Sequence, residues 1–248
     1  MTISRVRRFE ETQSYNEWEA WVRRVDGCLH DFAPDRAVAV VFDGDAPVFV
    51  KRMRFPVKRW WKRFLRRPRE CPLYKESKWL DTLSRFMSNM PRPIYYCQRR
   101  VNGQREVLLV ISYVDGTVLA MANGDQLRAQ ANGAAVALAG LHNLGISHGD
   151  AHLYNVMVSD TGLQFIDFER AGPLSPDSAL DDLRKLLAHL FASGLEAGQI
   201  IVVAQAYESA LQRPPLFDVA DCVRQAFEAA GRRKETRWRQ PQVIRLIR

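Results

Sequence analysis

The chain has 248 residues, of which 47% are hydrophobic, and a formal net charge of +8. This composition predicts a globular protein rather than a disordered one, and the length suits one sizeable core or two small lobes. Since no run of ~20 apolar residues, no signal peptide and no Cys-x-x-Cys pair is present, we expect a cytoplasmic protein without a zinc or redox site.

The positive charge is concentrated in two segments. Residues 51–69 hold ten Lys or Arg and no acid, and residues 231–248 hold seven against one Glu. The net charge of these two segments together exceeds that of the whole chain, so the remaining residues carry a net negative charge. The basicity is therefore a local property and not a global one.

The first predicted elements are two strands joined by a turn. Residues 37–42 are apolar and include three valines, Asp43-Gly44-Asp45 is a turn signal, and residues 47–51 read as a second strand. The second strand is predicted to end at Lys51.

A basic amphipathic helix is predicted between Pro56 and Pro68. Its apolar positions recur at helical spacing and include Trp60 and Trp61, while six Lys or Arg occupy the other face. Such a helix can lie in an anionic membrane surface. It can also pack on the protein with a solvated basic face, or bind nucleic acid through interleaved basic and aromatic side chains. We favour the membrane surface and regard nucleic acid as the least expected partner.

A second helix and an apolar strand follow. Residues 74–87 carry apolar positions at helical spacing, with Glu76 in phase with them and Asp81 out of phase. Glu76 can therefore point inward, although an acid in the first turn also stabilises the helix dipole. Residues 106–113 predict a buried strand, after which Asp115 begins a new segment.

The next segment predicts a helix, a polar loop and a hairpin. Residues 127–144 are rich in Ala and Leu, and Gly145 marks the helix end. The loop His148-Gly149-Asp150 follows. Two short apolar runs, 155–158 and 163–166, then flank a turn signal.

Three residues of this segment form a set suited to phosphoryl transfer. Asp150, Asn155 five residues later and Asp167 after the hairpin supply two carboxylates and an amide. One carboxylate can orient an attacking hydroxyl, while the other carboxylate and the amide oxygen can hold Mg²⁺ against phosphates. The alternative is a chance string of polar residues in an ordinary hairpin.

These strings resemble the catalytic and metal-binding loops of the protein-kinase-like superfamily. Within it the chain is most similar to bacterial lipopolysaccharide core kinases, which phosphorylate heptose or Kdo sugars; aminoglycoside and choline kinases carry similar strings. The resemblance implies an α+β, bilobal protein-kinase-like fold that binds ATP between the lobes. The amino-terminal lobe, 1–114, would hold a small antiparallel sheet, a helix and the basic insert 52–70. The mostly helical carboxy-terminal lobe, 115–248, would end in the basic tail 231–248.

The resemblance also implies roles in the carboxy-terminal lobe. Asp150 would orient the acceptor hydroxyl and accept its proton, with His148 supporting the catalytic loop. Asn155 and Asp167 would bind Mg²⁺. Asp182 would brace the loop from below, or else be an ordinary carboxylate at a helix start.

Three further residues would hold ATP. Lys51 stands where kinases place the lysine that binds the phosphates, and Glu76 would be its carboxylate partner. Asp115 falls at the expected hinge between lobes, where backbone groups would hold adenine. No Gly-x-Gly-x-x-Gly precedes the first strand, so the loop that covers the phosphates is not located.

Three departures from the protein-kinase pattern narrow the class of molecule expected as the phosphate acceptor. Gly149 replaces an arginine, Glu169 replaces the glycine after Asp-Phe, and the segment after Asp167 is short. These departures favour a sugar or small-molecule kinase without a phosphorylation switch.

We therefore predict an ATP-dependent kinase of a lipopolysaccharide inner-core sugar, heptose or Kdo. Because the lipopolysaccharide core is attached to lipid A in the inner membrane, we expect peripheral binding at the cytoplasmic face through Trp60, Trp61 and nearby Lys and Arg. Two alternatives stay open. One is a soluble phosphotransferase for an aminoglycoside, choline or sugar, and the other is an atypical Ser/Thr protein kinase or a kinase-fold binding protein.

Overall fold

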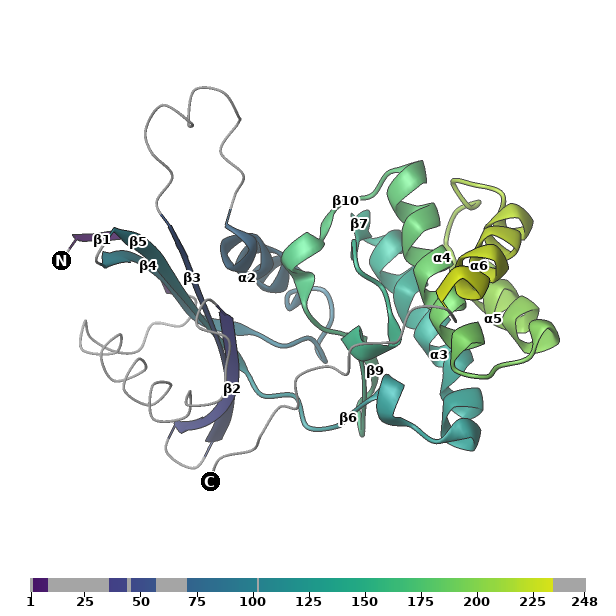
Figure 1. Cartoon of the computed structure of the whole chain (residues 1–248), viewed down its shortest axis with the longest axis horizontal. Helices are drawn as coiled ribbons and strands as arrows, with labels where there is room; N and C mark the ends of the chain where they lie inside the picture. The colour runs from purple at the N-terminus through teal and green to yellow at the C-terminus, as the bar shows by residue number, and fades with distance from the viewer. Residues whose placement is uncertain (1, 9–35, 44–45, 57–70, 102, 234–248) are drawn as a thin grey trace. The chain divides into compact units, whose positions relative to one another are not determined.

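The computed structural model describes residues 2–8, 36–43, 46–56, 71–101 and 103–233 (Figure 1). These residues form two compact units, which divide in the chain between Val114 and Asp115. In the described part of the chain, the first unit holds an antiparallel sheet and helix α2, and the second is mostly helical. The predicted basic helix with Trp60 and Trp61 lies outside the described residues, as does the predicted tail beyond Arg233.

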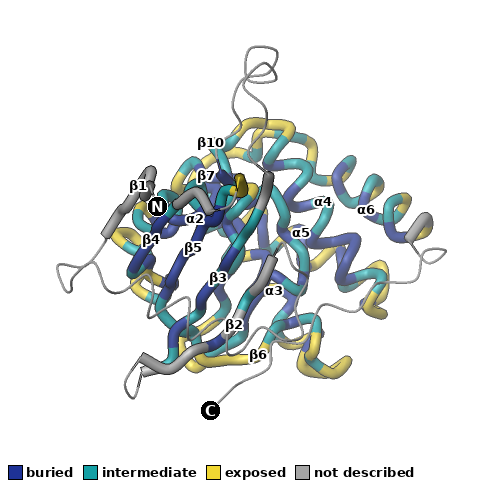
Figure 2. Tube along the Cα trace, turned by 60° about the vertical axis from the view of Figure 1, so that its left-hand side comes forward, coloured by how far each residue is buried: buried dark blue, intermediate teal, exposed yellow. Residues whose placement is uncertain are grey.

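The sheet of the first unit is antiparallel, with the strand order β1-β4-β5-β3-β2. Its strands are β1 (Thr2–Arg8), β2 (Arg36–Asp43), β3 (Ala46–Pro56), β4 (Pro93–Val101) and β5 (Gln104–Ser112). The central strand β5 is buried from residue 106 to 111, as the dark stretch in Figure 2 shows. Such a continuous apolar run is typical of a strand covered on both faces.

Strand β3 is longer than the predicted strand, so Lys51 lies in its middle and not at its end. Lys51 pairs with Val38 on β2 and with Leu109 on β5. The basic residues beyond it stay in the strand because a neighbouring strand supplies an acid. Arg54 lies directly opposite Glu106 on β5, with Nε 2.7 Å from Oε1.

Strands β1 and β4 are absent from the sequence prediction. β4 joins β5 through a hairpin in which Val101 pairs with Gln104, and Gly103 has φ +72°. This left-handed backbone favours glycine, and the sequence Asn102-Gly103 is a strong hairpin signal. The hairpin was therefore accessible from the sequence, whereas the pairing of β1 with β4 joins distant parts of the chain.

Helix α2 (Pro72–Leu83) packs on the sheet through β4 and β5. Pro72 stands in its first turn, where a missing N–H costs nothing. Its buried face consists of Leu73, Glu76, Ser77, Leu80 and Leu83. A glutamate therefore lies within an otherwise largely apolar stripe.

The second unit is built around α3 (Gly124–Asn143). The helix begins with a capping box, in which Asn123 and Gln126 satisfy each other's backbone N–H groups, and Gly145 with φ +74° follows its end. Its buried side chains are mainly Ala and Leu, which let neighbouring elements approach closely. The prediction of this helix is confirmed.

Short elements and three more helices complete the second unit. They are β6 (Thr117–Val118), η2 (Leu119–Met121), β7 (Ile146–Ser147), η3 (Leu153–Asn155), β8 (Val156–Ser159), β9 (Gly162–Phe165), η4 (Phe168–Arg170), β10 (Gly172–Pro173), α4 (Pro176–Ala192), α5 (Ala197–Ala210) and α6 (Val219–Arg233). The hairpin β8–β9 agrees with the predicted one. Among the described helices, none combines the length and apolar character needed to span a bilayer.

Candidate active site

The loop after β7 is fixed from inside by His148, whose side chain is fully buried. Its ring packs against Phe165 and Phe168, with ring centroids 5.0 and 4.9 Å away. Nδ1 accepts the Asp150 N–H at 3.3 Å, so the proton lies on Nε2, which donates to the Ile166 carbonyl at 2.9 Å. Burial lowers the pKa of His148, which keeps this imidazole neutral. The residue thereby ties the loop to the end of β9.

Asp182 of α4 holds the same loop from the other side. Its two carboxylate oxygens accept the backbone N–H groups of His148 at 2.7 Å and Gly149 at 2.8 Å. Oδ2 also lies 3.5 Å from Nε2 of His142, whose Nδ1 is 2.7 Å from the Tyr207 hydroxyl. Burial raises the pKa of Tyr207, so the hydroxyl stays protonated and can donate to that ring. Tyr207 of α5, His142 of α3 and Asp182 of α4 thus form a buried series of polar contacts that ends at the loop.

Glycine is the only residue type that fits at position 149. Its φ is +78°, and a Cβ there would lie 2.4 Å from the backbone oxygen of Arg170. An arginine, which protein kinases place here, would therefore collide with the backbone. This steric fact explains the glycine that the sequence analysis noted.

Asp150 follows in the loop with a side chain that is 30% exposed. Three basic side chains surround its carboxylate: Arg170 Nη1 at 3.5 Å, His152 Nε2 at 3.7 Å and Lys185 Nζ at 3.8 Å. The carboxylate is thus partly accessible to a substrate and is flanked by basic side chains. A group of this kind can orient a hydroxyl and accept its proton.

Asn155, at the end of η3, is attached to the same loop. Its amide nitrogen donates to the backbone oxygen of Asp150 at 3.0 Å, and its backbone oxygen accepts the Ile166 N–H at 2.9 Å. These contacts fix the amide so that its side-chain oxygen, Oδ1, accepts no hydrogen bond from the described residues. That oxygen is the atom that can bind a cation.

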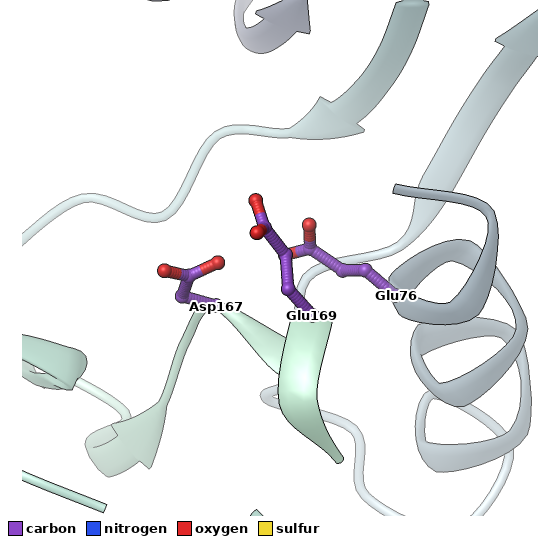
Figure 3. A group of neighbouring side chains, drawn as sticks. All are labelled: Glu76, Asp167 and Glu169. Carbon is purple, nitrogen blue, oxygen red and sulfur yellow. The ribbon is translucent and has the colours of Figure 1, made fainter. Parts of the chain in front are cut away.

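Asp167 lies directly after Ile166 and has φ +67°, the only non-glycine residue with positive φ in the described part of the chain. Its carboxylate has an oxygen within 4.8 Å of one from Glu169, and Figure 3 shows both side chains extending from this short segment. Carboxylate and amide oxygens are hard ligands that suit Mg²⁺. The donor set of Asn155, Asp167 and Glu169 therefore fits that ion by its chemistry.

The first unit contains a buried ion pair between strand β3 and helix α2. Lys51 Nζ lies 2.7 and 3.0 Å from the two carboxylate oxygens of Glu76. Glu76, which Figure 3 shows extending from α2, is fully buried, and Lys51 is 11% exposed. Asp81, the competing candidate, pairs instead with Arg85 on the same helix. Burying two charges costs free energy, so such a pair often marks a functional site.

Asp115 lies on the exposed segment between β5 and β6 and makes no hydrogen bond to the described residues. The next residue, Gly116, has φ +151°, and a Cβ there would lie 2.3 Å from the Val158 backbone oxygen. The backbone of this segment is therefore closely fitted to β8. No described contact bears on adenine, so that role of Asp115 stays a prediction.

Comparison with protein families now gives these residues a context. A family model described as the lipopolysaccharide kinase (Kdo/WaaP) family matches residues 47–207, well over half of the chain. The chain belongs to this family. The description of this family is that of kinases, which transfer a phosphoryl group to a hydroxyl. The matched range contains Lys51, Glu76 and the whole segment from His148 to Asp182.

A solved structure supports the fold of this member of the lipopolysaccharide kinase family. It resembles the protein WbdD in a 2.2 Å crystal structure, with a TM-score of 0.51, 17% sequence identity and coverage of 81% of this chain and 45% of WbdD. A second structure, described as the bifunctional kinase-methyltransferase WbdD, has a TM-score of 0.48 and 17% sequence identity. The match covers 77% of this chain and 42% of that one. The chain thus spans less than half the length of these neighbours, and at this identity the first shows the fold alone. The predicted protein-kinase-like α+β fold is confirmed. No curated protein matches the chain.

The structure adds residues that the sequence prediction of this family's site lacks. Lys185 and Arg170 reach Asp150 from α4 and η4, and Glu169 joins Asp167. Glu169 was accessible from the sequence, since a carboxylate two residues after a metal-binding Asp is a candidate ligand. Lys185 had no such signal, because it contacts the loop across 36 residues of chain.

Proposed function

We propose that this kinase transfers the γ-phosphoryl group of ATP to a hydroxyl of a lipopolysaccharide inner-core sugar, heptose or Kdo. The observation that carries the proposal is the partly exposed Asp150 carboxylate, on a loop whose backbone is fixed by buried Asp182 and His148. Phosphoryl transfer depends chiefly on positioning and electrostatics, which a fixed loop supplies. Membership of the Kdo/WaaP family supports lipopolysaccharide as the acceptor.

In this proposal Asp150 orients the sugar hydroxyl and takes its proton as the oxygen attacks phosphorus. His148 and Asp182 act on the loop backbone and make no hydrogen bond to the Asp150 carboxylate. Both neutral His148 and the Asp182 carboxylate are committed to the loop by their hydrogen bonds, so neither competes for the proton.

Asn155 and Asp167 would hold Mg²⁺, with Glu169 as a further oxygen ligand. When bound, the ion neutralises charge on the phosphate oxygens. The fixed amide of Asn155 supports this assignment, because its nitrogen is engaged and its oxygen is available. Lys51, held by Glu76, would bind the phosphates of ATP, and the segment at Asp115 would contact adenine.

The test is phosphate transfer from radiolabelled ATP to lipopolysaccharide purified from cells that lack the gene. Asp150→Asn keeps the shape of the side chain but cannot accept a proton, so we expect kcat to fall about 10²–10⁴-fold. The melting temperature should stay near that of the wild type, since this side chain is partly exposed. Asp160→Asn, an exposed acid in the β8–β9 turn, is the matched control and should keep full activity.

Full turnover by Asp150→Asn would contradict the assignment. Transfer to an aminoglycoside, choline or a free sugar, with none to lipopolysaccharide, would favour the small-molecule alternative. Transfer to a protein substrate alone would favour a protein kinase.

We also infer that the kinase meets its acceptor at the cytoplasmic face of the inner membrane, as a peripheral protein. The support is the basic sequence around Trp60 and Trp61, in which each Lys or Arg near an anionic surface contributes about 1 kcal/mol. The protein should sediment with vesicles containing phosphatidylglycerol but not with neutral phosphatidylcholine vesicles. Trp60→Ala/Trp61→Ala should weaken this binding, and equal binding by wild type and variant would refute the role of the two tryptophans.

A further inference from the structure

Lys185 is a partly buried cation that contacts the catalytic loop from helix α4. Its ammonium donates to the Gly149 backbone oxygen at 2.8 Å and lies 2.8 Å from Asp181 Oδ2. The same nitrogen, Nζ, lies 3.8 Å from Oδ1 of Asp150. The Lys185 side chain is 17% exposed. One ammonium thus connects the helix, the loop backbone and the carboxylate proposed as the base.

The other basic neighbours of Asp150 cannot take this place. Arg170 is 67% exposed, so water and salt screen its charge. His152 Nε2 also lies 3.4 Å from the amide nitrogen of Asn155, and its ring stacks on His189, so these neighbours set its position. Lys185 is less exposed than Arg170 and His152, and its ammonium also donates to the loop backbone at Gly149.

The length of the contact between Lys185 and Asp150 is informative. At 3.8 Å the ammonium is too far away for a hydrogen bond but close enough for strong attraction. The ammonium therefore holds the carboxylate in direction without a hydrogen bond of its own, and Oδ1 also lies 3.5 Å from Arg170 Nη1. Asp181 and the Gly149 oxygen keep the ammonium from moving closer.

We propose that Lys185 is a positioning residue for phosphoryl transfer, which fixes the Asp150 carboxylate through the loop backbone and through its charge. This inference rests on the proposed role of Asp150. It assigns to α4 a second task besides the support given by Asp182. It also gives Asp181 a purpose, since this carboxylate sets where the ammonium lies.

The test compares three variants in the lipopolysaccharide phosphorylation assay. Lys185→Met removes the charge and keeps the length of the side chain. Because a misplacement of about 1 Å can cost about 10²-fold, we expect kcat to fall about 10²-fold with little change in KM for ATP. Lys185→Arg should recover part of the loss. Arg184→Met is the matched control, since Arg184 also pairs with Asp181 on α4, and no described contact joins it to Asp150.

A merely structural Lys185 would give a different pattern. Lys185→Met and Arg184→Met would then lower the melting temperature and activity alike, and Lys185→Met with wild-type kcat would equally overturn the inference. Should Lys185→Met fail to fold, the kcat of Lys185→Gln relative to Lys185→Arg decides the question in the same way. Asp150→Asn measured in parallel separates the two proposals: an active Asp150→Asn overturns the proposed function. An inactive Asp150→Asn beside a fully active Lys185→Met overturns this inference alone.

Discussion

Two residues of the site, Gly149 and Asp167, have left-handed backbone conformations, with φ of +78° and +67°. Glycine adopts this region freely, whereas an aspartate there costs of order 1–2 kcal/mol. Such strain persists only where the surroundings impose it, and it gathers at functional positions. The flanking Ile166, whose backbone binds both His148 and Asn155, imposes it at Asp167.

Gly149→Ala tests how tightly the loop is fitted. An added Cβ would lie 2.4 Å from a backbone oxygen and would have to adopt a positive φ, so the loop must shift. We expect loss of most activity and a lower midpoint of thermal unfolding. Gly198→Ala in α5 is the matched control, because a Cβ there meets nothing within 4 Å. That change should leave activity intact and leave stability unchanged or slightly higher.

A Gly149→Ala variant with wild-type activity and melting temperature would contradict this account of the loop. The comparison with Gly198→Ala matters, because both changes alter the unfolded chain in the same way. Any difference in activity or melting temperature between the two variants therefore comes from the folded loop.

At the scale of elements, α4 organises the site. Asp182 offers two charge-assisted hydrogen bonds to the loop, each worth about 1.5–3 kcal/mol, and Lys185 adds a contact to Gly149. His142 of α3 and Tyr207 of α5 orient the Asp182 carboxylate from behind. The position of the loop is therefore set by the packing of three helices and not by the loop sequence alone.

The sequence predicted those elements whose signals are local. The Ala- and Leu-rich helix α3, the hairpin β8–β9 and the inward phase of Glu76 follow from spacing within a few residues. Strand β1 and the full length of β3 depend on partners elsewhere in the chain, whereas β4 was accessible through the Asn102-Gly103 signal. A basic run such as the one after Lys51 looks like a strand end until Glu106 is placed opposite Arg54.

The same distinction between local signals and contacts with distant parts of the chain holds for the site residues. Asp150, Asn155 and Asp167 lie in one stretch of 18 residues, so a motif could identify them. Asp182 was left between a structural and an ordinary role, because only the folded chain brings its carboxylate to the loop. Lys185 was missed entirely, since its contact with Gly149 has no signature in spacing.

At the scale of the whole molecule, the family and the charge pattern agree with the proposed acceptor. The chain belongs to the lipopolysaccharide kinase (Kdo/WaaP) family, and residues 57–69, which follow strand β3, hold seven Lys or Arg and no acid. A phosphorylated glycolipid in a membrane is an anionic target that such a segment suits. The acidic remainder of the chain would be repelled from the same surface, which favours contact through the basic segments.

The most direct measurement of the central claim is mass spectrometry of lipopolysaccharide from three strains. One lacks the gene, one carries the wild-type gene in its place, and one carries Asp150→Asn. We predict that the deletion removes one phosphate from an inner-core heptose or Kdo, that the wild-type gene restores it, and that Asp150→Asn does not. Identical lipopolysaccharide from all three strains would contradict the account.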